Sequence, residues 1–336
     1  MLQPYKLILS VIFATAALLA AGSEAAEWQT RAPLLEANSE TAVAQMGDKI
    51  YVFGGYPRLR ITVDTAIEYD AKTDSWRHIA RLPVKTNHAM AAAVNGRVYV
   101  IGGQQTAGGR RVGGRFQRED PKFLNRVFAW NPSTNQWAEK APMPSKRSGG
   151  VAVAAGGKIY VAGGRTRESG DDFAVYDPEA DRWTVLPDVP TQRNHLGAAA
   201  IDGKIYVVGG RFGPGFRSPK TDALEVYDPA ANTWSKRKPM LRPRGGINAV
   251  AANGCLHVFG GEGNDEAASG VYPDHDVYDP RSDSWRALDA MPVPVHGVTG
   301  MAFVNGWIHF PGGGTRIGGS SGNVIHQVVR TDITCR

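Results

Sequence analysis

The sequence predicts an all-β protein built as a closed circle of six four-stranded antiparallel units. Three observations carry this prediction: six Gly-Gly pairs that end apolar runs, a set of tryptophans in register with them, and one surplus tryptophan near the N-terminus. Glycine supplies 40 of 336 residues, well above the usual ~7%. Because the glycines come as spaced pairs, they indicate strand ends and turns.

The Gly-Gly pairs recur through the whole chain. They begin at Gly54, Gly102, Gly163, Gly209, Gly260 and Gly312, at steps of 48, 61, 46, 51 and 52 residues. The runs before them read IYVF, VYVI, IYVA, IYVV, LHVF and IHFP. Such β-branched and aromatic runs are typical of strands buried on both faces. A repeat of this length indicates one structural unit per Gly-Gly pair.

Tryptophans mark the end of each unit. Five of them follow an aromatic-polar pair by seven residues, as Trp183 follows Tyr176-Asp177. The turn residues between pair and tryptophan predict a hairpin. A second hairpin is predicted between the two innermost strands by dipeptides such as Asn95-Gly96. Each unit therefore has four antiparallel strands.

The spacing from each tryptophan to the next Gly-Gly pair indicates how the circle closes. The spacing is 27 residues from Trp285 and 26 residues from each of the other five: Trp28, Trp76, Trp137, Trp183 and Trp234. The first of these, Trp28, has no unit before it. We therefore expect the N-terminal strand to complete the last unit, which removes exposed sheet edges. The distance from Gly-Gly pair to tryptophan varies, so the variable loops lie between the second and third strands.

This pattern resembles the Kelch repeat family over essentially the whole chain after residue 26. The Gly-Gly pairs, the Tyr-Asp pairs and the tryptophans carry the resemblance, with Trp130-Asn131 and Pro311 as departures from it. The resemblance implies a six-bladed β-propeller. We expect one Kelch domain over residues 27–336, present as a monomer.

Residues 1–26 have the pattern of a secretory signal peptide. Lys6 precedes the apolar stretch Leu7 to Ala21, and small residues follow it. The stretch is short for a membrane span of about 20 residues, although an uncleaved anchor is the alternative. We expect cleavage between Gly22 and Ala26, export to a bacterial periplasm or secretion, and no membrane insertion afterwards. The net charge of +6 is dispersed, so nucleic acid is not an expected partner.

Arginines are predicted to gather at one mouth of the central channel. Antiparallel strands place the start of each innermost strand beside the end of the second strand. Sixteen residues before the Gly-Gly pairs stand Asn38, Thr86, Arg147, Arg193, Arg244 and His296, and the next positions include Asn87 and Asn194. Arg165 and Arg211 directly follow two Gly-Gly pairs, and Arg217 lies in a variable loop.

Such a mouth favours an anionic ligand, because the planar guanidinium binds a carboxylate through two hydrogen bonds. The alternative is that Arg147, Arg193 and Arg244 brace neighbouring blades. His88, His195 and His296 lie in alternate blades, so we expect them too far apart for one metal ion, and we expect no cofactor. Cys255 and Cys335 are either disulfide-bonded or separate thiols. The loop Gln104 to Asn125 is longer than its counterparts and is either functional or a solvated insertion.

Two functions are compatible with these features. The first is an exported binding module for an anionic small molecule, a glycan, or a protein or peptide partner, since the chain shows no complete catalytic motif. The second is a sugar-modifying enzyme, because the chain is similar to bacterial N-acetylneuraminate epimerases, which are periplasmic Kelch proteins. The run Pro214-Gly215-Phe216-Arg217 resembles one of their loops. That resemblance would make Arg217 catalytic, with Glu262 as the candidate acid or base.

Overall fold

A computed structural model of the chain describes residues 26–57, 61–106, 109–113, 115–118, 120–166, 173–319 and 321–335. These residues form strands and turns, and they contain no helix. Accordingly, no helix in the described ranges could cross a membrane. The predicted signal peptide, apart from Ala26, lies outside the described residues.

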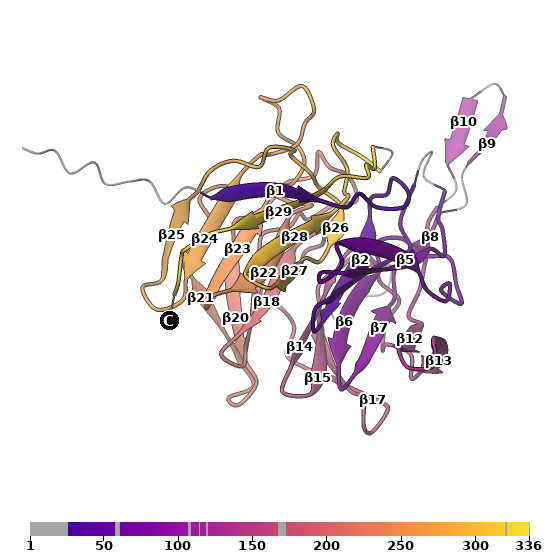
Figure 1. Cartoon of the computed structure of the whole chain (residues 1–336), viewed down its shortest axis with the longest axis horizontal. Coiled ribbons are helices and arrows are strands. Elements are labelled where there is room, and N and C mark those ends of the chain that lie inside the picture. The colour runs from indigo at the N-terminus through magenta and orange to yellow at the C-terminus, as the bar shows by residue number, and fades with distance from the viewer. Residues whose placement is uncertain are drawn as a thin grey trace, which may run out of the picture.

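Six sheets are arranged around a common axis as blades (Figure 1). Blade one holds β2(Thr41–Met46), β3(Lys49–Phe53), β4(Ala66–Asp70) and β5(Ser75–His78), and blade two holds β6(Met90–Val94), β7(Arg97–Ile101), β12(Val127–Asn131) and β13(Gln136–Lys140). Blade three holds β14(Val151–Ala155), β15(Lys158–Ala162), β16(Phe173–Asp177) and β17(Arg182–Val185), and blade four holds β18(Gly197–Ile201), β19(Lys204–Val208), β20(Leu224–Asp228) and β21(Thr233–Arg237). Blade five holds β22(Asn248–Ala252), β23(Cys255–Phe259), β24(His275–Asp279) and β25(Ser284–Ala287), and blade six holds β27(Ala302–Val304), β28(Trp307–Pro311), β29(His326–Arg330) and β1(Glu27–Arg31). The predicted all-β fold of six blades is confirmed. One sheet departs from four antiparallel strands, because the short strand β26(Val298–Thr299) pairs parallel with β2 and adds a fifth strand to blade one.

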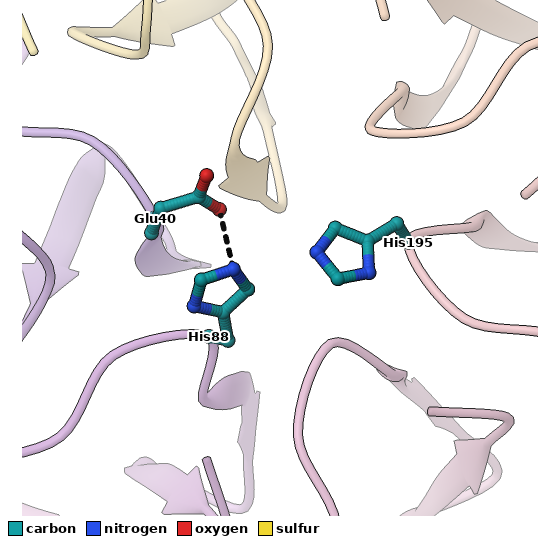
Figure 2. Close-up of side chains that lie close together, drawn as sticks. All are labelled: Glu40, His88 and His195. Carbon is teal, nitrogen blue, oxygen red and sulfur yellow. Dashed lines mark ion pairs between the residues drawn. The ribbon is translucent and has the colours of Figure 1, made fainter. Parts of the chain in front are cut away.

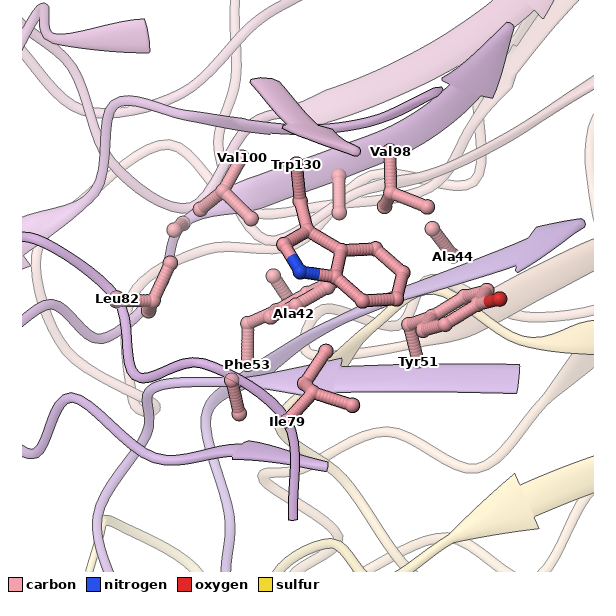
Figure 3. Close-up of a cluster of buried hydrophobic side chains, with 12 residues drawn as sticks. Ala42, Ala44, Tyr51, Phe53, Ile79, Leu82, Val98, Val100 and Trp130 are labelled. Atoms are coloured by element: carbon pink, nitrogen blue, oxygen red, sulfur yellow. The ribbon is translucent and has the colours of Figure 1, made fainter. Parts of the chain in front are cut away.

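The hydrophobic core lies between the blades. At the junction of blades one and two, Trp130 packs against Tyr51 and Phe53 and is fully buried (Figure 3). The second strands are buried on both faces, as their apolar runs predict. The inner strands carry small residues, such as the alanines of β18, because six strands must fit around one axis. They line a central cavity of about 260 Å³.

The Tyr-Asp and Trp landmarks fix the outer hairpins and join the blades. In blade one, the Tyr69 hydroxyl donates to Asp74 Oδ1 at 2.7 Å, and Asp74 accepts from the amide of Ala32 at 2.9 Å. The indole Nε1 of Trp76 donates to the Ala32 carbonyl at 2.9 Å. Ala32 directly follows the strand β1 of blade six, so the repeated motif ties each blade to the preceding one. Asp74 has a φ of 47°, which an aspartate tolerates better than most residues.

The ring closes as the sequence predicts. β1 pairs antiparallel with β29, so Trp28 lies opposite Val329 and completes blade six. A disulfide between Cys255 and Cys335 adds a covalent closure from blade five to the C-terminal segment, over a sequence separation of 80 residues. The disulfide, rather than two separate thiols, is therefore the arrangement in the structure.

The long loop of blade two folds into a ribbon. β8(Gln104–Gln105) pairs with β11(Lys122–Phe123) at its base, and β9(Gly109–Val112) pairs with β10(Arg115–Arg118) toward its tip. Figure 1 shows the β9–β10 hairpin standing away from the propeller body. The loop between Gln104 and Asn125 is thus built on paired strands rather than on an irregular insertion.

Candidate functional site at the mouth of the channel

Six residues, one from each blade, surround the axis just before the inner strands. We call them the axial ring: Glu40, His88, Gly149, His195, Gly246 and Gly297. All six have a left-handed backbone, with φ between 50° and 69°. Five of their amides form an open chain around the axis, in which each of the five donates to the carbonyl of the ring residue in the preceding blade. Five such bonds are present, from Gly297 through Glu40, His88, Gly149 and His195 to Gly246.

Three of these residues carry side chains in a conformation that favours glycine. A left-handed backbone costs a residue with a side chain about 1–2 kcal/mol, and such strain gathers at functional sites. The glycines between them leave the space that these side chains and their neighbours fill. A Cβ at Gly149 would lie 3.0 Å from the His195 ring, and one at Gly297 would lie 2.8 Å from the Glu40 carboxyl group.

Figure 2 shows Glu40, His88 and His195 converging from three blades. One potential ligand atom of each lies within 4.8 Å of the other two. His88 Nε2 is 3.1 Å from Glu40 Oε2, and the rings of His88 and His195 are 5.1 Å apart between centroids. The expectation that these alternate-blade histidines are far apart is therefore wrong. The cause is that both stand on the axial ring itself rather than on the wider rim.

Two matching Asn-His pairs orient the imidazoles. Asn87 Oδ1 is 2.6 Å from His88 Nδ1, and Asn194 Oδ1 is 2.6 Å from His195 Nδ1. The amide nitrogen of each asparagine donates to a backbone carbonyl, Gln104 O at 2.9 Å and Gly213 O at 3.3 Å. Since a carbonyl only accepts, the side-chain oxygen must face the histidine. Each Nδ1 therefore carries the hydrogen, and each Nε2 presents its lone pair.

The electrostatics around the ring keep the imidazoles neutral. Burial lowers the pKa of His88 even though Glu40 opposes it, and burial together with the nearby Arg211 places the pKa of His195 well below its usual range. Burial alone would raise the pKa of Glu262, but His296 and Arg211 outweigh it and lower that pKa. Two neutral imidazoles therefore share the mouth with an ionised carboxylate.

Glu262 connects blade four to blade six. Its carboxylate pairs with Arg211 Nη1, and its Oε2 accepts from the amide of Gly318 at 3.1 Å. His296 donates from Nε2 to the Arg316 carbonyl at 2.6 Å, which leaves His296 Nδ1 facing Glu262 Oε2 at 3.6 Å. Counting sixteen residues back from Gly312 places His296 at the arginine position of the repeat, but in the structure it lies one position later. Blade six has one extra residue near Gly300 between its ring residue and β27, so His296 corresponds to Asn87 and Asn194, and Val295 takes the arginine position.

The three arginines of that position turn into the blades. Arg193 donates from Nη1 to Glu225 Oε2 at 2.6 Å and from Nε to the Gly209 carbonyl at 2.7 Å, with its side chain fully buried. Arg244 pairs with Asp276 and donates to the Gly260 carbonyl at 2.9 Å. Arg147 donates to Ser145 Oγ and the Gly163 carbonyl. These contacts lie within single blades, so they differ from the bracing between neighbouring blades that the sequence leaves as the alternative.

The remaining predicted residues lie nearer the opening. Arg165 is half-buried over the ring of Phe123, with 5.4 Å between guanidinium carbon and ring centroid. Arg211 has 5% of its side chain exposed, and Arg217 is exposed on the following loop beside Phe216. Glu40 is the functional candidate that the sequence reasoning missed. Its signal was present, because glycine stands at this position in three of the six repeats, which indicates a left-handed backbone, and Glu40, His88 and His195 replace it in the others.

The fold and the axial ring define the molecule as a six-bladed β-propeller. A family model described as the KLHDC2/KLHL20/DRC7 Kelch-repeats domain matches residues 21–188 and 111–314. The chain belongs to the Kelch-repeat family.

Kelch-like relatives agree with this assignment, and a solved structure agrees with the fold. The chain is 28% identical over 305 residues to Kelch-like protein terF of Aspergillus terreus, covering 85% of this chain and 63% of the relative. It is 26% identical to alpha-scruin of Limulus polyphemus and 27% identical to Kelch-like protein 23 of Mus musculus, covering 78% and 80% of this chain but 28% and 36% of theirs. The chain thus spans less than two thirds of each relative's length. A structure titled "Structure of YjhT" matches with a TM-score of 0.72 and 19% identity, covering 89% of this chain and 97% of that one.

Proposed function

We propose that this chain is an exported Kelch-repeat binding protein that takes an anionic ligand at the mouth beside the axial ring. The ligand class is an acidic sugar or a carboxylate-bearing peptide. The observation that supports this most is the cationic sector of blades three and four. Arg165 and Arg211 occupy equivalent places after neighbouring Gly-Gly pairs, since each pairs with the start of its own inner strand.

Arg211 has a donor to offer. One of its Nη atoms pairs with Glu262, whereas its Nε is buried without a hydrogen-bond partner. A buried unpaired donor costs about 1–3 kcal/mol, and a carboxylate oxygen arriving through the mouth would accept from it. Arg217 and Lys220 in the loop above extend the positive charge outward, because the Lys220 side chain lies against Gly263 at the same mouth.

A thermal-shift comparison tests this proposal. N-acetylneuraminate and galacturonate should raise the melting temperature, whereas galactose should not, because only the acids carry the carboxylate. A ligand at 100 times its Kd adds about 2.7 kcal/mol of stability. Replacing the exposed Arg217 by alanine should raise the Kd of the acidic sugars roughly tenfold and so reduce the thermal shift. The Arg182→Ala variant is the matched control, since Arg182 is an exposed arginine on the outer strand β17.

Equal shifts with acid and neutral sugar would contradict an anion site. If no sugar shifts the protein, a carboxyl-terminal peptide library is the second arm. An amidated version of each peptide that binds should then lose affinity. Failure of both arms would overturn the proposal.

The sugar-modifying alternative uses the same mouth. It would assign Glu262, whose lowered pKa keeps it ionised, to proton abstraction and Arg217 to the substrate carboxylate. An enzyme of this kind would speed the equilibration of N-acetylneuraminate anomers and lose that rate in Arg217→Ala. A binding protein would show the thermal shift without the rate.

A further inference from the structure

The axial ring brings three Lewis bases together. His88 Nε2 and Glu40 Oε2 are 3.1 Å apart, and the Asn-His pairs leave lone pairs on the Nε2 atoms of both His88 and His195. Glu40 Oε2 and His195 Nε2 are buried and have no hydrogen-bond partner. Buried acceptors that face one another repel unless a proton or a metal ion lies between them.

We propose that Glu40, His88 and His195 bind one divalent first-row transition-metal ion, such as Zn²⁺, on the propeller axis. Two imidazoles and one carboxylate are a donor set that such ions favour. This inference goes beyond the proposed anion binding and does not depend on it.

The geometry is close to that of a bound site. Bonds of about 2.0–2.1 Å in a tetrahedral site put ligand atoms roughly 3.3 Å apart. The pair His88–Glu40 is already at 3.1 Å, and all three ligand atoms lie within 4.8 Å of one another.

The surroundings supply the hydrogen bonds that metal-binding histidines use. Such a histidine usually donates its other ring N–H to an oxygen, which fixes the tautomer and the ring orientation. Asn87 and Asn194 do this for His88 and His195 at the same distance of 2.6 Å, although they lie in blades two and four. His296 Nδ1, 3.9 Å from Glu40 Oε1, is a further nitrogen within reach. An ion held by three protein ligands keeps a place for water or another ligand.

The left-handed backbone of the three ligands provides an unusually clean test. Glycine occupies the same ring place in blades three, five and six, so His88→Gly and His195→Gly remove a ligand and also relieve backbone strain. We expect both variants to fold, with melting temperatures in the absence of metal no lower than that of the unmodified protein. Glu40→Gln is the third variant, because it keeps the side-chain size and removes the charge.

The experiment is calorimetric titration of the chelator-treated protein with ZnCl₂, together with the visible spectrum after CoCl₂ addition. We expect one ion per chain with a Kd of 1 μM or tighter, and a Co²⁺ absorption band that marks nitrogen and oxygen ligation. Each glycine variant should weaken binding at least 100-fold. His78→Gln should bind as the unmodified protein does, since His78 is exposed on β5.

Absence of binding below 100 μM in the folded protein would overturn the metal site and leave a proton shared between His88 and Glu40 as the cation. One-to-one binding that persists in both glycine variants would place the ion elsewhere and overturn the assignment equally. Neither result bears on anion binding, which the sugar and peptide titrations measure separately.

Discussion

Two arginines of blade four, at different positions of the repeat, have different surroundings. Arg193 lies just before the axial ring in sequence, yet its guanidinium points into the blade, where Glu225 and backbone carbonyls surround it. Arg211 lies after the Gly-Gly pair of the same blade, and its guanidinium stays beside Glu262 at the mouth. Sequence alone predicts both at the same mouth, because it does not show the direction in which each side chain points.

Removing Arg193 should therefore act on stability. In Arg193→Leu the buried carboxylate of Glu225 loses its counter-charge, and breaking a buried pair in this way costs about 3–5 kcal/mol. Urea unfolding measures the change, and the double variant with Glu225→Leu should recover most of it. Arg182→Leu on the exposed face of blade three is the control. A loss below about 1 kcal/mol for Arg193→Leu, with altered sugar response, would instead assign it to the ligand.

Two pairs of buried histidines lie across neighbouring strands, one pair in blade five and one in blade six. In blade five, His257 Nδ1 is 2.9 Å from His275 Nε2 across β23 and β24. In blade six, His309 Nδ1 is 3.0 Å from His326 Nε2 across β28 and β29. Burial lowers the pKa of His257 and His326 to about 3 and that of His309 to about 4. His257 and His309 lie in second strands, which the apolar runs predict to be buried on both faces, and the pairing itself depends on strand register.

These pairs should make the fold sensitive to mild acid. A histidine with a pKa near 6.5 in the unfolded chain and near 3 or 4 in the folded chain stabilises the fold fully above pH 6.5 and loses that contribution as pH falls. Each residue should lose about 2–3 kcal/mol between pH 6.5 and pH 4.5, above the range where most carboxylates titrate. Urea midpoints across this interval measure it.

The control for the acid effect is His195→Gly, which removes an axial-ring histidine. Most of the dependence of the urea midpoint on pH should remain in this variant. His309→Leu with His326→Leu should reduce it, while the blade-five pair of His257 and His275 keeps its own share. A urea midpoint that stays constant from pH 6.5 to pH 4.5 in the unmodified protein would contradict the neutral buried pairs.

At the scale of the whole molecule, the fold was predictable because the residues that determine it repeat in every blade. The site was not predictable, because its residues occur in some blades only. The Gly-Gly pairs and the tryptophan spacing determine blade number, strand order and closure by β1, because the same residues recur at the same places in each repeat. The site depends on departures from the repeat. Glu40, His88 and His195 replace glycine in the axial ring, and one extra residue near Gly300 shifts the register of His296. The positions of these four side chains could therefore not be predicted without the backbone structure.

The central claim is that the mouth is a preorganised polar site, in which neighbouring residues fix the histidines before any ligand arrives. The most direct measurement is ¹⁵N NMR of the protein labelled at its 8 histidines, which separates the two neutral tautomers. We expect His88 and His195 to carry hydrogen on Nδ1, and the signals of His88, His195 and His296 to move when N-acetylneuraminate or Zn²⁺ is added. Hydrogen on Nε2 in both His88 and His195, or ligand shifts confined to the buried pairs of blades five and six, would contradict the account.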